Sequence, residues 1–371
     1  MSNMRVRESR HSPPLRGGTV SLHAVYRRVF RVAVGGFFVV YSVFTLIPLY
    51  LLFVRTFVST KDATELWLWV PPAEEINMNA EFGNLAIYYN LDPQKVKKDF
   101  GIPASVYIKP SWTLARIGEE YGIPEEEIKR YFGPFVRYNG WLALLSHVQF
   151  FPSVGRTILL TAGGILGLNV LSILTGTALA RLRRRYQMFV YNLYLFQTVI
   201  PIFLILVPQF VVVQWLLGLI PGYDSPGLVR QTGQLVMLVI MYAQGGALST
   251  MIYTSFIATI PQELEDAAEI DGASRWQYMR YIQLPLMKIP VASLTVIALT
   301  QIWNNFLAPY VYLDAQNTTL LPLIQSYAGQ YSTNFQAIYT GVFLSALPLV
   351  VIYLSFRRWF IRGVMAGAIK G

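Results

Sequence analysis

The chain has 371 residues, of which 54% are hydrophobic and only 13% are charged, and its formal net charge is +10. Soluble domains carry about a quarter charged residues, so this composition, with a mean hydropathy of +0.42, excludes a large soluble core and predicts an integral membrane protein. The absence of cysteine excludes disulfides, thiolate metal sites and a cysteine nucleophile. The three histidines are scattered without ligand spacing, so we expect no metal site and no cofactor.

The first part of the chain predicts a tail, one membrane span and a long outer region. Residues 1–31 are polar and rich in arginine, which predicts a basic cytoplasmic N-tail. The apolar run 32–54 is long enough to cross about 30 Å of hydrocarbon as a helix. Residues 55–156 carry mixed charge and are much longer than an ordinary connection, so we predict a partly folded extracytoplasmic region with an insertion at 58–138.

The insertion contains a segment with helical periodicity, residues 114–131, with an expected break at Gly122-Ile123-Pro124. It predicts a helical hairpin that packs on a partner subunit. The run 113–131 also faintly resembles the helical part of a LysM glycan-binding module. A complete strand-helix-helix-strand unit would favour the alternative that residues 58–138 bind glycans and that the spans are only an anchor.

The core, residues 157–356, is predicted to contain five further spans. The first of them, 157–180, is rich in glycine, which favours close packing between transmembrane helices. The next is interrupted by Pro201 and Pro208, which predicts either a broken helix that lines a pathway or a simple kink. The other four predicted spans are 189–217, 234–256, 291–313 and 337–356. The glycines of the span 157–180 are Gly163, Gly164, Gly167 and Gly176.

Six spans place both termini on the same side of the membrane. Basic residues are concentrated in the N-tail, in the loop after the second span, in the hairpin 259–290 and in the C-tail 357–371. The short loops of the opposite side contain only Arg230. By the positive-inside rule, both termini and the hairpin are cytoplasmic and the protein is a multi-pass component of the cell membrane.

The hairpin 259–290 is charged and amphipathic between two apolar runs. Thr259 and Gln262 have capping-box spacing, Pro261 suits a first helical turn, and acidic residues at 263, 265 and 266 suit the positive end of a helix. Gly272 predicts a left-handed stop. A second helix is expected to start at a capping pair, Ser274 and Gln277, and to end before Pro285.

The residue order of this hairpin resembles the "EAA loop" of ABC importer permeases. Asp266-Ala267-Ala268 stands where the family has Glu-Ala-Ala, and Gly272 and the Ile-x-Leu-Pro ending at Pro285 follow at the family spacing. The resemblance implies a coupling helix that docks into a cleft of a cytoplasmic ATPase subunit. The coupling residues implied are Glu265, Asp266, Ala267, Ala268, Asp271, Gly272, Ala273, Ile282, Leu284 and Pro285.

Two further stretches resemble the carbohydrate branch of the family, the maltose-permease type. Trp303-Asn304-Asn305-Phe306 resembles a family motif, and Trp303, Asn304 and Asn305 are candidate pathway residues, with hydrogen bonding between helices as the alternative. The glycine-rich C-tail implies an approach to the interface of the ATPase dimer. Its candidate residues are Gly363, Gly367, Lys370 and Gly371.

The expected fold is therefore an all-α membrane protein with six transmembrane helices, a cytoplasmic coupling helix and an extracytoplasmic insertion between helices 1 and 2. The resemblance implies the permease subunit of an ATP-driven importer for a sugar or oligosaccharide, with a non-sugar solute as the alternative. The sequence has no phosphate-binding loop, so ATP hydrolysis is assigned to a separate subunit. The expected partners are an ABC ATPase dimer, a second permease subunit, an extracytoplasmic solute-binding protein, the sugar and membrane lipid, and no nucleic acid.

Overall fold

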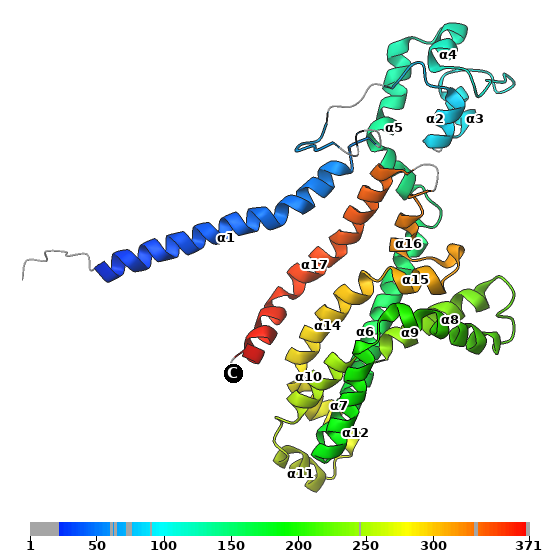
Figure 1. The fold of residues 1–371 in the computed structure, drawn as a ribbon. Coiled ribbons are helices and arrows are strands. Elements are labelled where there is room, and N and C mark those ends of the chain that lie inside the picture. The colour runs from blue at the N-terminus through cyan, green and yellow to red at the C-terminus, as the bar shows by residue number, and fades with distance from the viewer. Residues whose placement is uncertain are drawn as a thin grey trace, which may run out of the picture. The chain divides into compact units, whose positions relative to one another are not determined.

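The computed structural model describes residues 22–59, 62, 65–71, 76–89, 91–244, 246–329 and 333–368. Within these ranges every regular element is a helix, and β-pairing is limited to two isolated bridges, as the all-α prediction requires. The chain divides into two compact units, residues 1–51 and 52–371, which are described separately (Figure 1).

The first unit consists of most of helix α1, Leu22–Arg55. The helix starts well before the predicted span at residue 32, so residues 22–31 of the predicted N-tail are helical. The rest of the predicted N-tail lies outside the described residues. The segment Val29–Arg55 is long and apolar enough to cross a membrane.

In the described part of the second unit, two helices meet the same criterion, α6 (Phe150–Ala180) and the segment Phe335–Ser355 of α17. Three bent helix pairs meet it together, so the described chain holds three candidate spans, or up to six if each bent pair is one span. The pairs are α7 (Arg184–Val199) with α8 (Ile202–Gly218), α9 (Leu228–Ala243) with α10 (Ala247–Ile257), and the segment Arg275–Leu286 with α14 (Lys288–Trp303).

The breaks within these pairs only partly follow the sequence prediction. Helices α7 and α8 meet at 102° where Pro201 precedes α8, as predicted, whereas Pro208 lies inside α8. Helices α9 and α10 meet at 49° beside Gly246, so the predicted span over 234–256 is a bent pair of helices. The predicted span 291–313 covers two helices, because α14 ends at Trp303 and a separate short helix, α15 (Leu307–Tyr312), follows.

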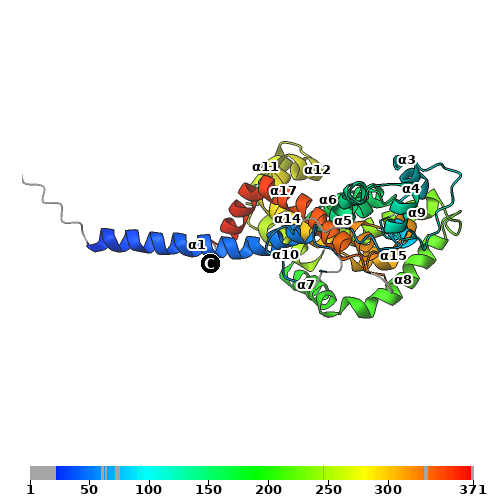
Figure 2. The ribbon, with the colours of Figure 1, turned by 90° about the horizontal axis from the view of Figure 1, so that it is seen from above.

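Helix α6 is the centre of the core and packs against α9, α10 and α14 (Figure 2). Its glycines make this contact possible, as predicted. A Cβ built on Gly167 would lie 2.4 Å from Cβ of Ala243, and one on Gly164 would lie 2.8 Å from Cβ of Tyr242. Neither distance leaves room for a side chain, so these positions fix how closely α9 approaches α6.

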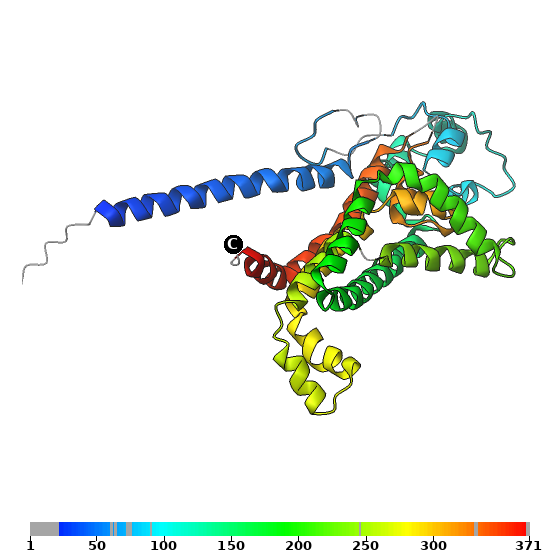
Figure 3. The same cartoon turned by 60° about the horizontal axis from the view of Figure 1, so that its bottom comes forward.

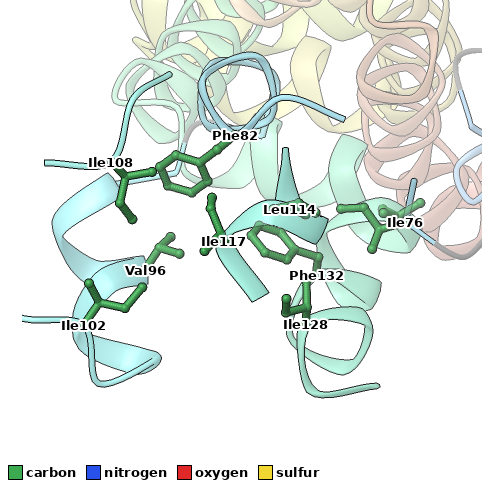
Figure 4. Packing of buried hydrophobic residues seen from close by; sticks show 10 residues of the cluster. Ile76, Phe82, Val96, Ile102, Ile108, Leu114, Ile117, Ile128 and Phe132 are labelled. Carbon is green, nitrogen blue, oxygen red and sulfur yellow. The ribbon is translucent and has the colours of Figure 1, made fainter. Parts of the chain in front are cut away.

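The insertion is a helical subdomain with its own apolar core. Helix α4 (Leu114–Tyr121) ends at Gly122, whose φ of +66° is left-handed, and α5 (Glu125–Leu145) begins beyond it, so the predicted break is confirmed. The other two helices are α2 (Phe82–Tyr88) and α3 (Pro93–Asp99). Figure 4 shows Phe82, Leu114 and Phe132 converging with the isoleucines and valine of this core.

The four helices of the insertion form two copies of one helix-turn-helix unit. Positions 82 and 114 begin α2 and α4, and positions 93 and 125 begin α3 and α5, so both starts are 32 residues apart. The backbone N–H of Phe82 donates to the carbonyl of Trp112 at 2.8 Å, and that of Leu114 donates to the carbonyl of Ala80 at 3.2 Å. These two bonds join equivalent positions of the two copies, because Ala80 and Trp112, like Phe82 and Leu114, are 32 residues apart.

Helix α5 continues from the insertion into the core, where it packs against α17 (Phe335–Ala368). The amide of Gln336, 1% exposed, donates to the carbonyls of Arg137 (2.7 Å) and Thr56 (3.0 Å). Helix α17 runs through Ala368, so the backbone at two of the C-tail candidates, Gly363 and Gly367, is helical. The two remaining tail candidates, at 370 and 371, lie outside the described residues.

Candidate functional site

The hairpin that the sequence singled out begins with helix α11 (Glu263–Ile270), which carries Glu263, Glu265 and Asp266 in its first turn, as predicted. The predicted capping box at its start was wrong. Its N-cap, Gln262, makes no side-chain cap hydrogen bond, and the hydroxyl of Thr259 instead donates to the carbonyl of Phe256 at 2.7 Å. The Thr259 side chain therefore caps a carbonyl at the end of α10 and does not cap the first backbone amides of α11.

The turn of the hairpin and its second helix follow the sequence prediction. Gly272 has a φ of +79°, and the backbone N–H of Ala273 donates to the carbonyl of Ala268 at 2.9 Å. Helix α12 (Arg275–Tyr278) starts with a complete capping box between Ser274 and Gln277, with N···O distances of 2.7 and 3.3 Å. Glycine at 272 is thus required by the backbone itself.

The predicted end of the second helix before Pro285 was wrong. The chain stays helical through a π-turn, Met279–Gln283, and through α13, Leu284–Leu286, before it bends by 76° into α14. A π-turn widens the helix immediately before the proline, where the ring would otherwise clash with a carbonyl of the preceding turn. The bend between hairpin and membrane helix is therefore at Met287.

The hairpin is tied to the end of α6 at two points. Arg181, the C-cap of α6, forms an ion pair with Glu265 of α11. The amide of Gln283, 1% exposed, donates to the hydroxyl of Thr177 at 2.7 Å. One tie holds α11 and the other holds the π-turn, so the hairpin is fixed to the end of α6 at both points.

The expected coupling residues lie on both faces of the hairpin. Ala268 is 7% exposed and faces the protein, whereas Asp266, Ala267, Asp271 and Gly272 are exposed. The remaining members differ in burial: Glu265, Ala273, Ile282 and Leu284 are half-buried, Pro285 is exposed, and Leu284 packs against the cluster around Tyr253 and Met287.

Several large apolar side chains of the hairpin are exposed and were missed by the sequence analysis. Ile270 at the end of α11 is 87% exposed, and Trp276 in α12 is 61% exposed. Figure 3 shows the hairpin projecting beyond the helices of the core. Exposed apolar groups on a projecting element are typical of a surface that binds another protein.

The residues expected to line a pathway have different roles in the structure. Trp303 is 4% exposed, and its Nε1 donates to the carbonyl of Ser345 at 2.9 Å, which joins α14 to α17. The Oδ1 of Asn305 accepts from the backbone N–H of Ala308 at 3.0 Å and caps the start of α15. Asn304 is exposed. Of the three, Asn304 alone is left with an exposed side chain.

The sequence analysis missed a polar cluster between α6, α10 and α14. Asn169 of α6 donates to the hydroxyl of Thr295 at 3.2 Å and accepts from the hydroxyl of Tyr253. The hydroxyls of Ser172 and Ser249 lie 2.9 Å apart on the same interface. The signal was present, because an amide within an apolar span is costly unless it is hydrogen-bonded. These bonds lock together the helices that carry the hairpin on both sides.

Residues 169–365 match the family described as binding-protein-dependent transport system inner membrane component. The chain belongs to this family. The match covers the end of α6 and every later helix, including the hairpin, and it leaves out the insertion. Membership confirms the predicted permease family, a membrane location and a role in transport rather than catalysis.

Several curated proteins of this transport family are similar to the chain. The probable starch degradation products transport system permease protein AmyC of Thermoanaerobacterium thermosulfurigenes is 28% identical over 217 residues, which cover 58% of this chain and 74% of AmyC. The melibiose/raffinose/stachyose import permease protein MelC of Bacillus subtilis is 28% identical, with coverages of 58% and 75%. The lactose transport system permease protein LacG of Rhizobium radiobacter is 32% identical over 152 residues, which span 55% of LacG.

Among solved structures, a chain of a bacterial ABC transporter involved in the import of the acidic polysaccharide alginate has a TM-score of 0.57 at 15% sequence identity. The alignment covers 90% of this permease and 97% of that chain. At this identity the comparison establishes a similar fold.

Proposed function

We propose that this permease is one transmembrane subunit of an ATP-driven importer for a sugar or oligosaccharide. The sugar assignment is supported by the names of three similar permeases, AmyC, MelC and LacG, which act on carbohydrates. The motif at 303–306 and the glycine-rich C-terminus, which resemble the maltose-permease type, support it independently of those names. The subunit forms half of the translocation pathway, and a second permease subunit supplies the other half.

The observation that carries the coupling mechanism is the pair of exposed apolar side chains, Ile270 and Trp276, on a hairpin tied to α6. We place a cleft of the ATPase subunit over this surface. Closure of the ATPase dimer then moves the hairpin as a lever, and the ties at Arg181 and Thr177 pass the movement to α6. The C-terminal candidates at 363, 367, 370 and 371 are assigned to the same ATPase interface.

The proposed topology has six spans, with the bent pairs counted as single spans and both termini in the cytoplasm. The insertion and the hairpin lie at opposite ends of the second unit, which supports opposite sides of the membrane (Figure 1). On the outer side, the insertion caps the pathway and contacts the solute-binding protein or the second permease. The domain boundaries of this proposal are 1–31, 32–54, 55–156, 157–356 and 357–371.

The alternative of a membrane-anchored glycan-binding protein receives no support from the insertion. Its described residues form helix pairs, and its single β-contact is the bridge between Glu81 and Thr113. A LysM-type unit would need two strands that flank the helices. Of the two candidates, the importer alone uses the projecting hairpin and the residue order that resembles the coupling motif of the family.

The proposal is tested with Gly272→Arg in the chain co-expressed with its ATPase. Gly272 faces open space within this chain, so the arginine disturbs only the left-handed backbone and whatever docks there. The matched control is Gly122→Arg, because Gly122 has a similar φ of +66° and equally open surroundings in the insertion. We expect Gly272→Arg to abolish sugar uptake and ATPase co-purification while Gly122→Arg retains both.

Two outcomes contradict the proposal. If ATPase co-purifies with Gly272→Arg at the wild-type level and uptake is normal, the hairpin is not the docking element. If uptake assays with the wild-type transporter detect phosphate or peptide import and no sugar import, the substrate assignment is wrong while the coupling mechanism stands.

A further inference from the structure

A run of apolar side chains is exposed where the insertion begins. Residues 65–71 read Glu-Leu-Trp-Leu-Trp-Val-Pro, and no residue after the glutamate is charged. The side chains of Leu66, Leu68 and Trp69 are 72%, 53% and 66% exposed. This stretch lies outside residues 169–365, so the family match assigns it no role. Adjacent exposed apolar side chains mark a surface that contacts another molecule or a membrane.

The segment is held against the protein by the residue between the exposed groups. Trp67 is half-buried and its Nε1 is shielded from solvent, so its neighbours on both sides face outward. Elsewhere in the described insertion, the large exposed apolar side chains are Ile87 and Tyr107, which occur singly along the chain, as is normal on protein surfaces. Three such groups within four residues are therefore a distinct feature of the entry to the insertion.

Two membrane-spanning segments meet at this entry. The segments Val29–Arg55 and Phe335–Ser355 are each long and apolar enough to cross a membrane. The amide of Gln336 donates to the carbonyl of Thr56 at 3.0 Å, so the end of one segment lies beside the start of the other. Both ends therefore mark the same membrane boundary, which is the outer one on the proposed topology.

Aromatic rings and arginines gather at this boundary. The guanidinium of Arg55 lies over the ring of Tyr339, 5.8 Å from its centroid. That of Arg137, whose carbonyl also binds the boundary amide, lies 5.9 Å from the ring centroid of Tyr138. Tyr138 and Phe335 are 40% and 38% exposed. Amphipathic aromatic rings and long basic side chains are typical of the layer between hydrocarbon and water.

Backbone hydrogen bonds tie the exposed segment to the same boundary. Nη1 of Arg55 donates to the carbonyl of Asp62 at 3.5 Å. The backbone N–H of Glu65 donates to that same carbonyl at 3.0 Å. Leu66 follows at once, with its Cα about 3.8 Å from that of Glu65. The headgroup layer is about 5–8 Å thick on each side of a bilayer, so the apolar segment starts at the level of that layer.

We propose that Leu66, Leu68 and Trp69 anchor the start of the insertion in the outer headgroup layer, with the lipid bilayer as their partner. An indole suits this place, because its apolar ring contacts acyl carbons while its N–H bonds to water or headgroups. The other end of the insertion returns to the core at Arg137, which Gln336 holds at the same boundary. The lipid anchor and this hydrogen bond thus fix the insertion at both ends. This inference goes beyond the proposed function, which gives the insertion protein partners only.

The test uses the fluorophore NBD on a single cysteine introduced by Leu66→Cys, because the chain has no native cysteine. The assembled transporter is placed in nanodiscs whose lipids carry a spin label either at the headgroup or at the end of the acyl chain. We expect blue-shifted emission that is lost to the headgroup label more than to the acyl-end label. The control is Glu127→Cys, which is exposed in α5 ten residues before Arg137 and so about 15 Å further along the helix. Its emission should be that of NBD in water, with no loss to either lipid label.

A second variant tests whether the tryptophan takes part. With NBD at Leu66→Cys, the additional change Trp69→Ser should reduce the loss of emission to the headgroup label, and an unchanged loss would overturn the proposed anchor. Blue-shifted emission that neither spin-labelled lipid quenches would show that a protein partner covers the segment. Unshifted emission would show that it lies in water, and both results overturn the inference. The substituted positions are exposed and lie outside the hairpin, so ATPase co-purification, the test of the proposed function, should be unchanged in every variant.

Discussion

Replacement of Gly167 by alanine tests how tightly the membrane core is packed. The added Cβ would lie 2.4 Å from Cβ of Ala243, whereas carbon atoms in contact prefer about 3.5–4.0 Å. Helix α9 must therefore move away from α6 by about 1 Å. Overpacking of this kind costs about 1–3 kcal/mol, and the better helix propensity of alanine recovers about 0.5–1 kcal/mol of it.

The matched control is Gly155→Ala in the same helix, where an added Cβ meets nothing within 4 Å. This variant gains the propensity term without the clash, so the two variants should differ by about 2 kcal/mol. We expect the thermal midpoint of the purified protein in nanodiscs to be a few degrees lower for Gly167→Ala than for Gly155→Ala. The second variant Ala243→Gly should restore the midpoint when it is combined with Gly167→Ala, because it removes the opposing methyl group.

Equal midpoints for Gly167→Ala and Gly155→Ala would refute this account of α6 packing. Failure of Ala243→Gly to restore the midpoint would show that the strain lies in another contact. In either case the glycines of α6 would be explained by something other than the approach of α9.

Three further predictions concern topology, titration and the insertion. The chain contains no native cysteine, so an impermeant thiol reagent applied outside should label a cysteine introduced at Glu127 and not one introduced at Glu269. Both positions are exposed, so reversed labelling would show that the proposed topology is inverted. Burial and the 2.8 Å hydrogen bond to Asp99 raise the pKa of Tyr131 to about 12 from about 10 in unfolded chains. The stability of the insertion should therefore fall as pH rises from about 10 to 12, and Tyr131→Phe should remove that fall in a circular-dichroism titration. Replacement of residues 65–135 by a short Gly/Ser linker should preserve ATPase co-purification and weaken the stimulation of ATP hydrolysis by loaded binding protein. Loss of the ATPase from the complex would refute the proposal that the insertion is an outer cap.

The sequence was most informative where one local feature decides the backbone. Gly122 and Gly272 are left-handed stops, and the Ser274–Gln277 capping box forms as its spacing requires. The close contact at Gly167 also follows from local composition, since only glycine lets another helix backbone approach so near. Each of these predictions depends on a few adjacent residues.

The sequence was least informative where distant segments compete. The break beside Gly246 and the end of α14 at Trp303 interrupt apolar segments that have no break in their hydropathy. Hydropathy reports how favourably residues transfer into lipid and carries no information on helix direction. The anchoring of Gln283 on Thr177 and that of Arg156 on the carbonyl of Thr318 depend on contacts across more than a hundred residues. Neither periodicity nor a short motif carries that information.

The duplication within the insertion has a consequence for which parts of it can fold alone. One helix-turn-helix unit alone would leave Phe82 and Val96, or their equivalents Leu114 and Ile128, facing water. Two copies in one chain meet at the high effective concentration set by a short linker, so each covers the apolar face of the other. Excision of only one copy should therefore destabilise the copy that remains.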